Sequence, residues 1–148
     1  MLGCDDALTE EIAMQPVPYL FFHDTCEEAF TFYASVFGTT PQFMRVKGSA
    51  MEAELPAEAA NAIMHAHLPI GSGAINGSDN LSPEPGPAMA GCNVMVSFPD
   101  VATARAHFDK LSEGGEVRMP FQPEFWSPGF GAFTDRFGIR WMIDTDAG

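Results

Sequence analysis

Hydrophobic and polar residues follow two different periods near the start of this chain, and the change of period separates a strand from a helix. Residues 18–24 are an apolar run of strand length with several aromatic residues. In residues 25–38 the apolar positions recur every three or four residues, a spacing typical of a helix packed on one face; they are Ala29, Phe30, Tyr33, Val36 and Phe37. Thr25 and Glu28 stand where a capping box would begin this helix, and Gly38 is placed to end it.

Three strand-length segments follow the helix and complete a β-α-β-β-β order. They cover residues 41–48, 62–71 and 73–79, with glycine turns between them and an acidic segment rich in small residues at 49–61. The next stretch, residues 80–91, contains three prolines and two glycines, a composition that favours a linker.

The second half of the chain repeats this order. Residues 92–98 predict a strand, residues 100–115 a helix capped by Asp100, and three more short strands follow. A shift of 75 residues places Thr25 on Asp100 and Tyr33 on Phe108. We therefore predict an α+β fold in which two β-α-β-β-β modules form curved mixed sheets around a cleft. The expected boundaries are a tail at 1–15, a first module at 16–80, a linker at 81–91 and a second module at 92–148.

The net charge of the chain limits the kinds of molecule it can bind, and its cysteine content indicates the cellular compartment. Twenty acidic residues against 7 basic ones give a formal net charge of −13, which repels phosphate backbones and anionic lipid surfaces. Neither nucleic acid nor a membrane is therefore expected as a partner. Three cysteines without CxxC spacing, and no charged-then-apolar leader, indicate a cytoplasmic protein. The thirteen phenylalanines indicate an apolar interior or an apolar pocket.

The segment "MHAHL", residues 64–68, raises the question of a metal site. In a strand, residues two apart point to the same face, so His65 and His67 could reach one ion or one ligand. Asp79 on the next strand is a candidate third donor. Two strand histidines without further partners are more often structural or ligand-contacting, which favours a pocket or core position for His65. His23 and His107 are interpreted as surface or satisfied polar groups.

Three segments of the chain are similar to a known family. The helix segment "EEAFTFYASVFG", the turn "GGEVRMP" and the run "FWSPGFGAFTDRFGIRW" resemble the PhnB-like branch of the vicinal oxygen chelate superfamily, which includes glyoxalase, bleomycin-resistance and dioxygenase proteins. The likeness covers about residues 17–144. It implies paired β-α-β-β-β modules, in agreement with the internal duplication, and it implies a homodimer.

The resemblance also implies where metal ligands would stand. Metal-dependent members of the superfamily take a His, Gln or Glu from the first and fourth strands of each module. Here those positions fall on Pro18 or Tyr19, on Asn93, on Gly77 or Asp79, and on Met142. They offer at most two of the three or four nitrogen and oxygen donors that a divalent cation requires, so no metal or other cofactor is expected.

The expected function is therefore small-molecule binding of the glyoxalase/bleomycin-resistance type, without an intact metal site and with a hydrophobic or aromatic ligand. The candidate pocket residues are Tyr19, Phe21, His65, Asp79, Asn93, Trp126 and Met142. The alternative is a divergent metal-dependent lyase, isomerase or dioxygenase that uses His65, His67 and Asp79. The chain has no glycine-rich strand-to-helix loop for S-adenosylmethionine, which argues against the demethylubiquinone methyltransferase activity often ascribed to this branch.

Overall fold

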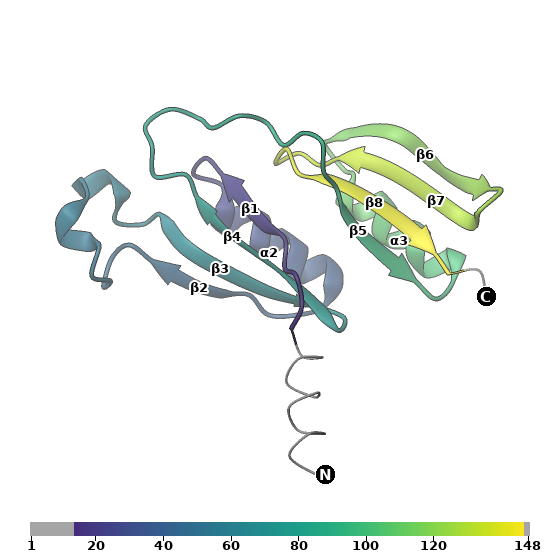
Figure 1. The fold of residues 1–148 in the computed structure, drawn as a ribbon, viewed down its shortest axis with the longest axis horizontal. Helices are drawn as coiled ribbons and strands as arrows, with labels where there is room; N and C mark the ends of the chain where they lie inside the picture. Colours follow the sequence, from purple (N-terminus) through teal and green to yellow (C-terminus); the bar gives the residue numbers. More distant parts are fainter. Residues whose placement is uncertain (1–13, 147–148) are drawn as a thin grey trace, which may run out of the picture.

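The computed structural model describes residues 14–146, which form two β-α-β-β-β modules (Figure 1). The first module consists of β1 (Tyr19–Phe22), α2 (Cys26–Phe37), β2 (Gln42–Arg45), β3 (Ile63–Ile70) and β4 (Gly73–Asp79), with short 3-10 helices η1 (Glu52–Glu54) and η2 (Ala57–Ala59) before β3. The second consists of β5 (Val94–Phe98), α3 (Val101–Leu111), β6 (Glu116–Glu124), β7 (Ser127–Thr134) and β8 (Arg140–Thr145). The predicted fold class is thus confirmed, whereas most of the predicted tail at 1–15 lies outside the described residues.

The two sheets have the same strand order, which confirms the internal duplication. The first sheet runs β1-β4-β3-β2 and the second β5-β8-β7-β6. In each, the first strand of the module pairs in parallel with the last, and the other pairs are antiparallel. The helices begin at Cys26 and Val101, and 101 − 26 gives the same 75-residue offset that the sequence pattern predicts.

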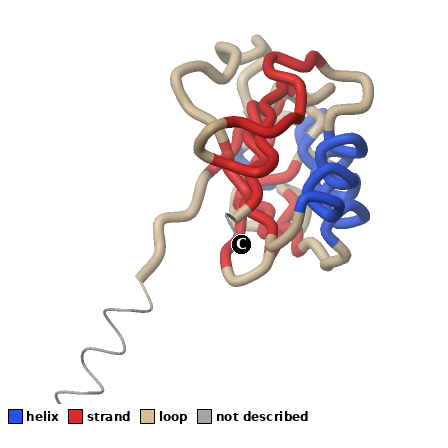
Figure 2. Tube along the Cα trace, turned by 90° about the vertical axis from the view of Figure 1, so that its right-hand side faces the viewer, coloured by secondary structure: helices blue, strands red, loops and turns tan. Residues whose placement is uncertain are grey.

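Both helices cover the same side of the strands (Figure 2). In β1 the side chains of Leu20 and Phe22 are buried on the helix side, whereas Tyr19 and Phe21 alternate with them and are exposed. In β8, Trp141 and Ile143 are buried and Met142 faces the other way. The strand side chains that point away from both helices form what we call the open face.

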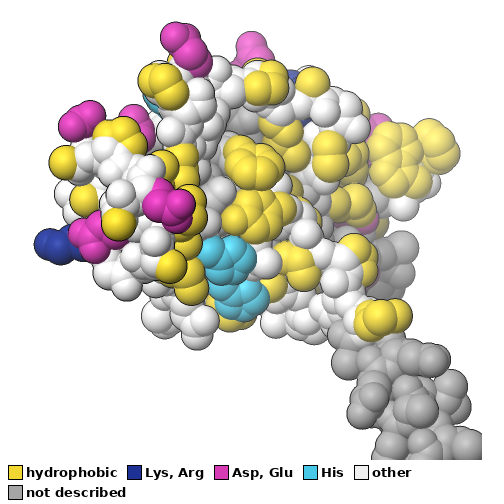
Figure 3. Space-filling view, turned by 60° about the vertical axis from the view of Figure 1, so that its left-hand side comes forward, with side chains coloured by type: hydrophobic (Ala, Val, Ile, Leu, Met, Phe, Trp, Pro, Cys, Tyr) yellow, Lys and Arg dark blue, Asp and Glu magenta, His cyan; other side chains and the backbone are white. Residues whose placement is uncertain are grey.

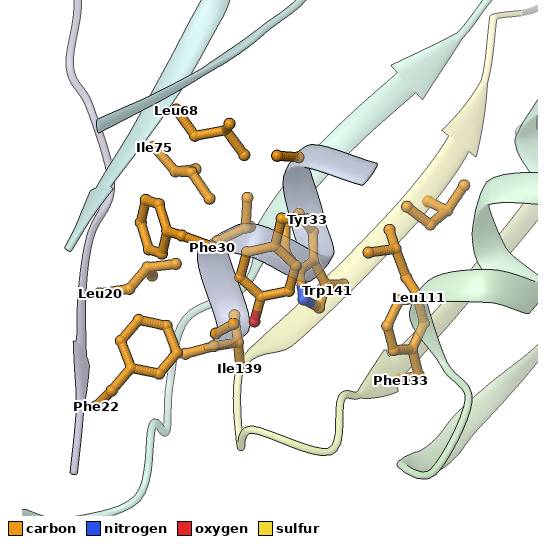
Figure 4. Close-up of a cluster of buried hydrophobic side chains, with 14 of the residues drawn as sticks. Leu20, Phe22, Phe30, Tyr33, Leu68, Ile75, Leu111, Phe133, Ile139 and Trp141 are labelled. Carbon is orange, nitrogen blue, oxygen red and sulfur yellow. The ribbon is translucent and has the colours of Figure 1, made fainter. Parts of the chain in front are cut away.

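The modules are joined through their helix sides, where Tyr33 of α2 packs against Trp141 of β8 with ring centroids 5.2 Å apart (Figure 4). The Asp135 carboxylate, only 3% exposed, accepts hydrogen bonds from the Tyr33 hydroxyl and from Trp141 Nε1. It also accepts the backbone N–H groups of Phe137 and Ile139. The Asp135 carboxylate therefore stabilises the turn before β8 in its own module and also binds α2 of the first module through the Tyr33 hydroxyl.

The start of α2 differs from the prediction. Thr25 occupies the N-cap position but makes no side-chain capping hydrogen bond, so the expected capping box with Glu28 does not form. Instead the carboxylate of Asp79, at the end of β4, accepts the N–H of Cys26 at 2.9 Å. The cap of α3 is as predicted, because Asp100 accepts the Thr103 N–H at 2.8 Å. Among residues 14–146, no helix is both long enough and apolar enough to cross a membrane.

Candidate functional site

The open face of the first sheet carries most of the candidate residues of the first module. The register aligns Tyr19, Asn76 and His67 across β1, β4 and β3, and it places Phe21 beside Ser78 of β4. Met44 of β2 lies opposite His65. Phe21 is 69% exposed and Met44 53%. In Figure 3, histidine side chains adjoin exposed hydrophobic ones on this side of the molecule.

Both histidines of β3 have polar neighbours on this face. The Tyr19 hydroxyl lies 3.4 Å from His65 Nδ1, and the two rings are 5.8 Å apart. His67 Nδ1 lies 2.7 Å from the Asn76 side-chain oxygen, which can only accept. An N–H on Nδ1 of His67 would donate to this oxygen, and Nε2, the other ring nitrogen, would then be available to a ligand. His65 and His67, with β2, line a hollow of about 390 Å³.

Asp79 does not join these histidines. Asn76 and Ser78 of β4 share the open face with them, whereas Asp79 is the next residue along and points to the helix side. Its two oxygens accept the N–H groups of Cys26 and Ile63, and the residue is 6% exposed. The set His65, His67 and Asp79 is therefore split between the two faces of one sheet.

A groove of about 550 Å³ lies between the two modules. Pro18 and Ala74 line it from the first module, and Asn93, Met95 and Ser97 line it from the second. Strands β1 and β5 make no hydrogen-bonded pair with each other among the described strands, so the groove separates the two sheets. Pro18 and Asn93 are equivalent under the 75-residue shift, since 93 − 18 is 75, and the fold brings them to one groove.

The open face of the second sheet is rich in methionine. The register aligns Met95, Met142, Ala132 and Met119 across β5, β8, β7 and β6. Trp126, in the turn between β6 and β7, is 48% exposed and packs edge-on against Phe130 at 5.4 Å. Flexible thioethers beside aromatic rings form a surface that adapts to apolar ligands of different shape.

Arg118 of β6 lies on this second sheet and is absent from the sequence-derived candidates. Its Nη2 donates to the Asn93 side-chain oxygen at 2.6 Å and to the carbonyl oxygen of Phe133 at 3.0 Å. Its Nε is buried without a hydrogen-bond partner. Partial burial lowers the pKa of this guanidinium and the positive charge of Arg140 lowers it further, whereas the negative charge of Glu116 acts in the opposite direction. The available sequence signal was a basic residue within the otherwise largely apolar run "VRMPF" of a chain with only 7 basic residues.

His23 and His107 lie outside the strands of the open face, although His107 also lines the groove between the modules. His23 follows β1 and lines a separate hollow of about 450 Å³, with its Nδ1 buried and unpaired. His107 of α3 lies within hydrogen-bonding distance of the Thr103 carbonyl oxygen, 2.8 Å away, and stacks on Phe98 at 4.5 Å between ring centroids. His107 thus has the satisfied position that its place on a helix predicts.

The residues at the family's ligand positions do not fit a divalent cation. Tyr19 and Met142 lie on different sheets, Asp79 faces α2, and the side-chain oxygen of Asn93 is engaged by Arg118. Within residues 14–146, no three His, Cys, Asp or Glu side chains are grouped so that they could hold a metal ion. The open face therefore offers aromatic, thioether and imidazole groups rather than a ligand cage.

The sequence of this chain is similar to a known protein family and to a bacterial protein. The sequence profile of the Glyoxalase/Bleomycin resistance protein/Dioxygenase superfamily matches residues 16–143. Protein YjdN of Escherichia coli (strain K12) is 29% identical over 137 residues, which cover 86% of this chain and 92% of YjdN.

Two solved structures are also similar. Protein PA1353 from Pseudomonas aeruginosa is 40% identical with a TM-score of 0.81, and the match covers 90% of this chain and 98% of that protein. The PhnB protein from Bacillus cereus is 19% identical with a TM-score of 0.72. That match covers 89% of this chain and 99% of the PhnB protein. At this identity the likeness to the PhnB protein concerns the fold alone.

Proposed function

The chain belongs to the Glyoxalase/Bleomycin resistance protein/Dioxygenase superfamily, and from this premise we propose that it binds a small apolar or aromatic molecule on its open face without a metal ion. The observation that carries the proposal is the composition of that face. Tyr19, Phe21, Met44 and Met95 are all more than 40% exposed there. Soluble proteins seldom leave such a surface uncovered unless it binds a ligand or a partner.

The polar groups of the face supply specificity for the ligand. The Tyr19 hydroxyl and the imidazole groups of His65 and His67 can exchange hydrogen bonds with a polar substituent of a ring held against Phe21. The groove beside Pro18 and Asn93 extends the same surface toward the second module, and its volume of about 550 Å³ suits a drug-sized molecule.

The protein forms a homodimer in this proposal. The two sheets are open rather than closed around a cavity, and a second copy would cover the parts of the open face that the ligand leaves exposed. Light scattering at micromolar concentration is expected to give about 32 kDa, twice the 16.0 kDa of one chain. A species of 16 kDa would contradict the dimer but not the binding site.

The binding site is tested with an uncharged aromatic probe, 2-naphthamide, followed by its fluorescence or by calorimetry. The variant Phe21→Ala removes an exposed ring from the open face and is expected to weaken binding about tenfold. The control Val101→Ala changes an exposed apolar side chain at the start of α3, on the helix side, and should leave the affinity unchanged. If the wild type has no dissociation constant below the millimolar range, or both variants bind equally well, the proposed site is wrong.

Elemental analysis separates this function from metal-dependent chemistry. Untagged protein purified without chelator is expected to contain less than a stoichiometric amount of any transition metal. A stoichiometric metal that is lost in His65→Ala would overturn the metal-free proposal, because His65 and His67 are the imidazole groups of the open face.

A further inference from the structure

We propose that the ligand carries a negatively charged group, such as a carboxylate, and that Arg118 binds it at the Asn93 end of the second sheet. This inference rests on the proposed function, because it names the chemical class of the ligand for the same face. The structural observation is a half-buried guanidinium whose hydrogen-bond acceptors are neutral oxygens.

The charge of Arg118 has no carboxylate in direct contact, although Glu116 stabilises it from beyond ion-pair distance. The chain has 20 acidic residues, yet within residues 14–146 no carboxylate lies within 4.0 Å of Arg118. Nη2 is held by the Asn93 side chain and by the carbonyl oxygens of Phe133 and Trp141, and Nε is buried without a partner. A partly desolvated cation with only neutral acceptors gains strongly from an anion, because planar guanidinium and carboxylate groups form paired hydrogen bonds.

Arg140 adds a second positive charge to the same end of the sheet. It lies close enough to lower the pKa of Arg118, and its Nε donates to the carbonyl oxygen of Cys92, which is again a neutral partner. Glu116 offsets this repulsion only from beyond ion-pair distance, and a bound anion in direct contact would relieve the rest.

The remainder of the second sheet fixes how such a ligand would lie. Met142 follows Trp141, whose carbonyl oxygen Arg118 contacts, and the methionine row of Met95, Met142 and Met119 continues the face. Two residues beyond Met142, Asp144 has a buried side-chain oxygen without a partner, and its charge would repel an anion at that end. A ligand that contacts Phe21 would therefore extend along the groove to the second sheet, with the adjoining apolar part over the methionines and its anionic group toward Asn93.

The test compares 2-naphthoate with 2-naphthamide, which have the same rings and differ in charge. We expect the wild type to bind the naphthoate at least about tenfold more tightly, the size of one charge-assisted hydrogen bond. In Arg118→Met this preference should fall below about threefold while the affinity for 2-naphthamide stays within about threefold of wild type. The control Arg136→Met removes an equal charge from a guanidinium that lies over the Phe32 ring at 4.0 Å, and it should keep the preference.

The outcomes separate this inference from the function on which it rests. If the wild type binds both probes equally, or if Arg118→Met keeps the preference, the anion site is wrong and the apolar site stands. If neither probe binds the wild type, both proposals fail. The comparison of the two probes on wild-type protein does not depend on any variant. It can therefore refute the inference even if circular dichroism shows that Arg118→Met does not fold.

Discussion

The junction between the modules offers the sharpest test of how this fold is held together. Tyr33 of α2 donates its hydroxyl to Asp135 of the second module, and both residues are buried. The substitution Tyr33→Phe keeps the ring packed against Trp141 and removes only the hydroxyl. Asp135→Ala removes the acceptor and leaves every group that donates to it without a hydrogen-bond partner.

The two substitutions should lower the free energy of unfolding by different amounts, because they remove different numbers of hydrogen bonds. Tyr33→Phe loses one hydrogen bond to a carboxylate, so we expect a loss of about 1.5–3 kcal/mol in the free energy of unfolding. Asp135→Ala leaves four donors without an acceptor: the Tyr33 hydroxyl, Trp141 Nε1, and the N–H groups of Phe137 and Ile139. At about 1 kcal/mol each, the lower end of the range for a buried unsatisfied group, the loss is at least about 4 kcal/mol. That is a large part of the stability of an ordinary domain, about 5–15 kcal/mol.

Urea unfolding followed by circular dichroism and tryptophan fluorescence measures both losses. The chain supplies a matched control, because its only other tyrosine, Tyr19, is 41% exposed on the open face. Tyr19→Phe should change the free energy of unfolding by less than about 0.5 kcal/mol. The reasoning fails if Tyr33→Phe costs no more than Tyr19→Phe, or if Asp135→Ala costs no more than Tyr33→Phe.

Three further predictions concern other contacts. Gly77→Ala should destabilise the first module by about 1–3 kcal/mol in urea unfolding, because an added Cβ would lie 2.9 Å from the Phe30 ring; an unchanged midpoint would contradict this. Burial raises the pKa of the Cys26 thiol from 9.0 to about 12, so the unfolded chain ionises first and stability should fall as the pH rises from about 9 to about 12; Cys26→Ala should reduce that slope. Arg45→Ala, which breaks an exposed ion pair with Glu27, should cost no more than about 1 kcal/mol, and a larger loss would show that this pair matters more than its exposure indicates.

The helices and the duplication could be predicted from the chain alone because both depend on local spacing. The apolar stripe that contains Ala29, Phe30 and Tyr33 is buried in α2, and the shift of 75 residues carries Tyr33 onto Phe108, which is buried in α3. The period of a helix is fixed by its backbone geometry, so one face of such a pattern must find a core. The alternation of Tyr19 and Phe21 with buried neighbours follows from the strand backbone in the same way.

The tertiary structure decided which side chains meet. The cap of α2 comes from Asp79, 53 residues away from Cys26, rather than from the local Thr25. The same placement turns Asp79 away from His65 and His67, whose spacing alone allowed a shared metal site. Arg118 reaches Asn93 across 25 residues. Local sequence determines the period and the side of each element, but partners far apart in the chain are chosen by strand register and packing, which no short stretch contains.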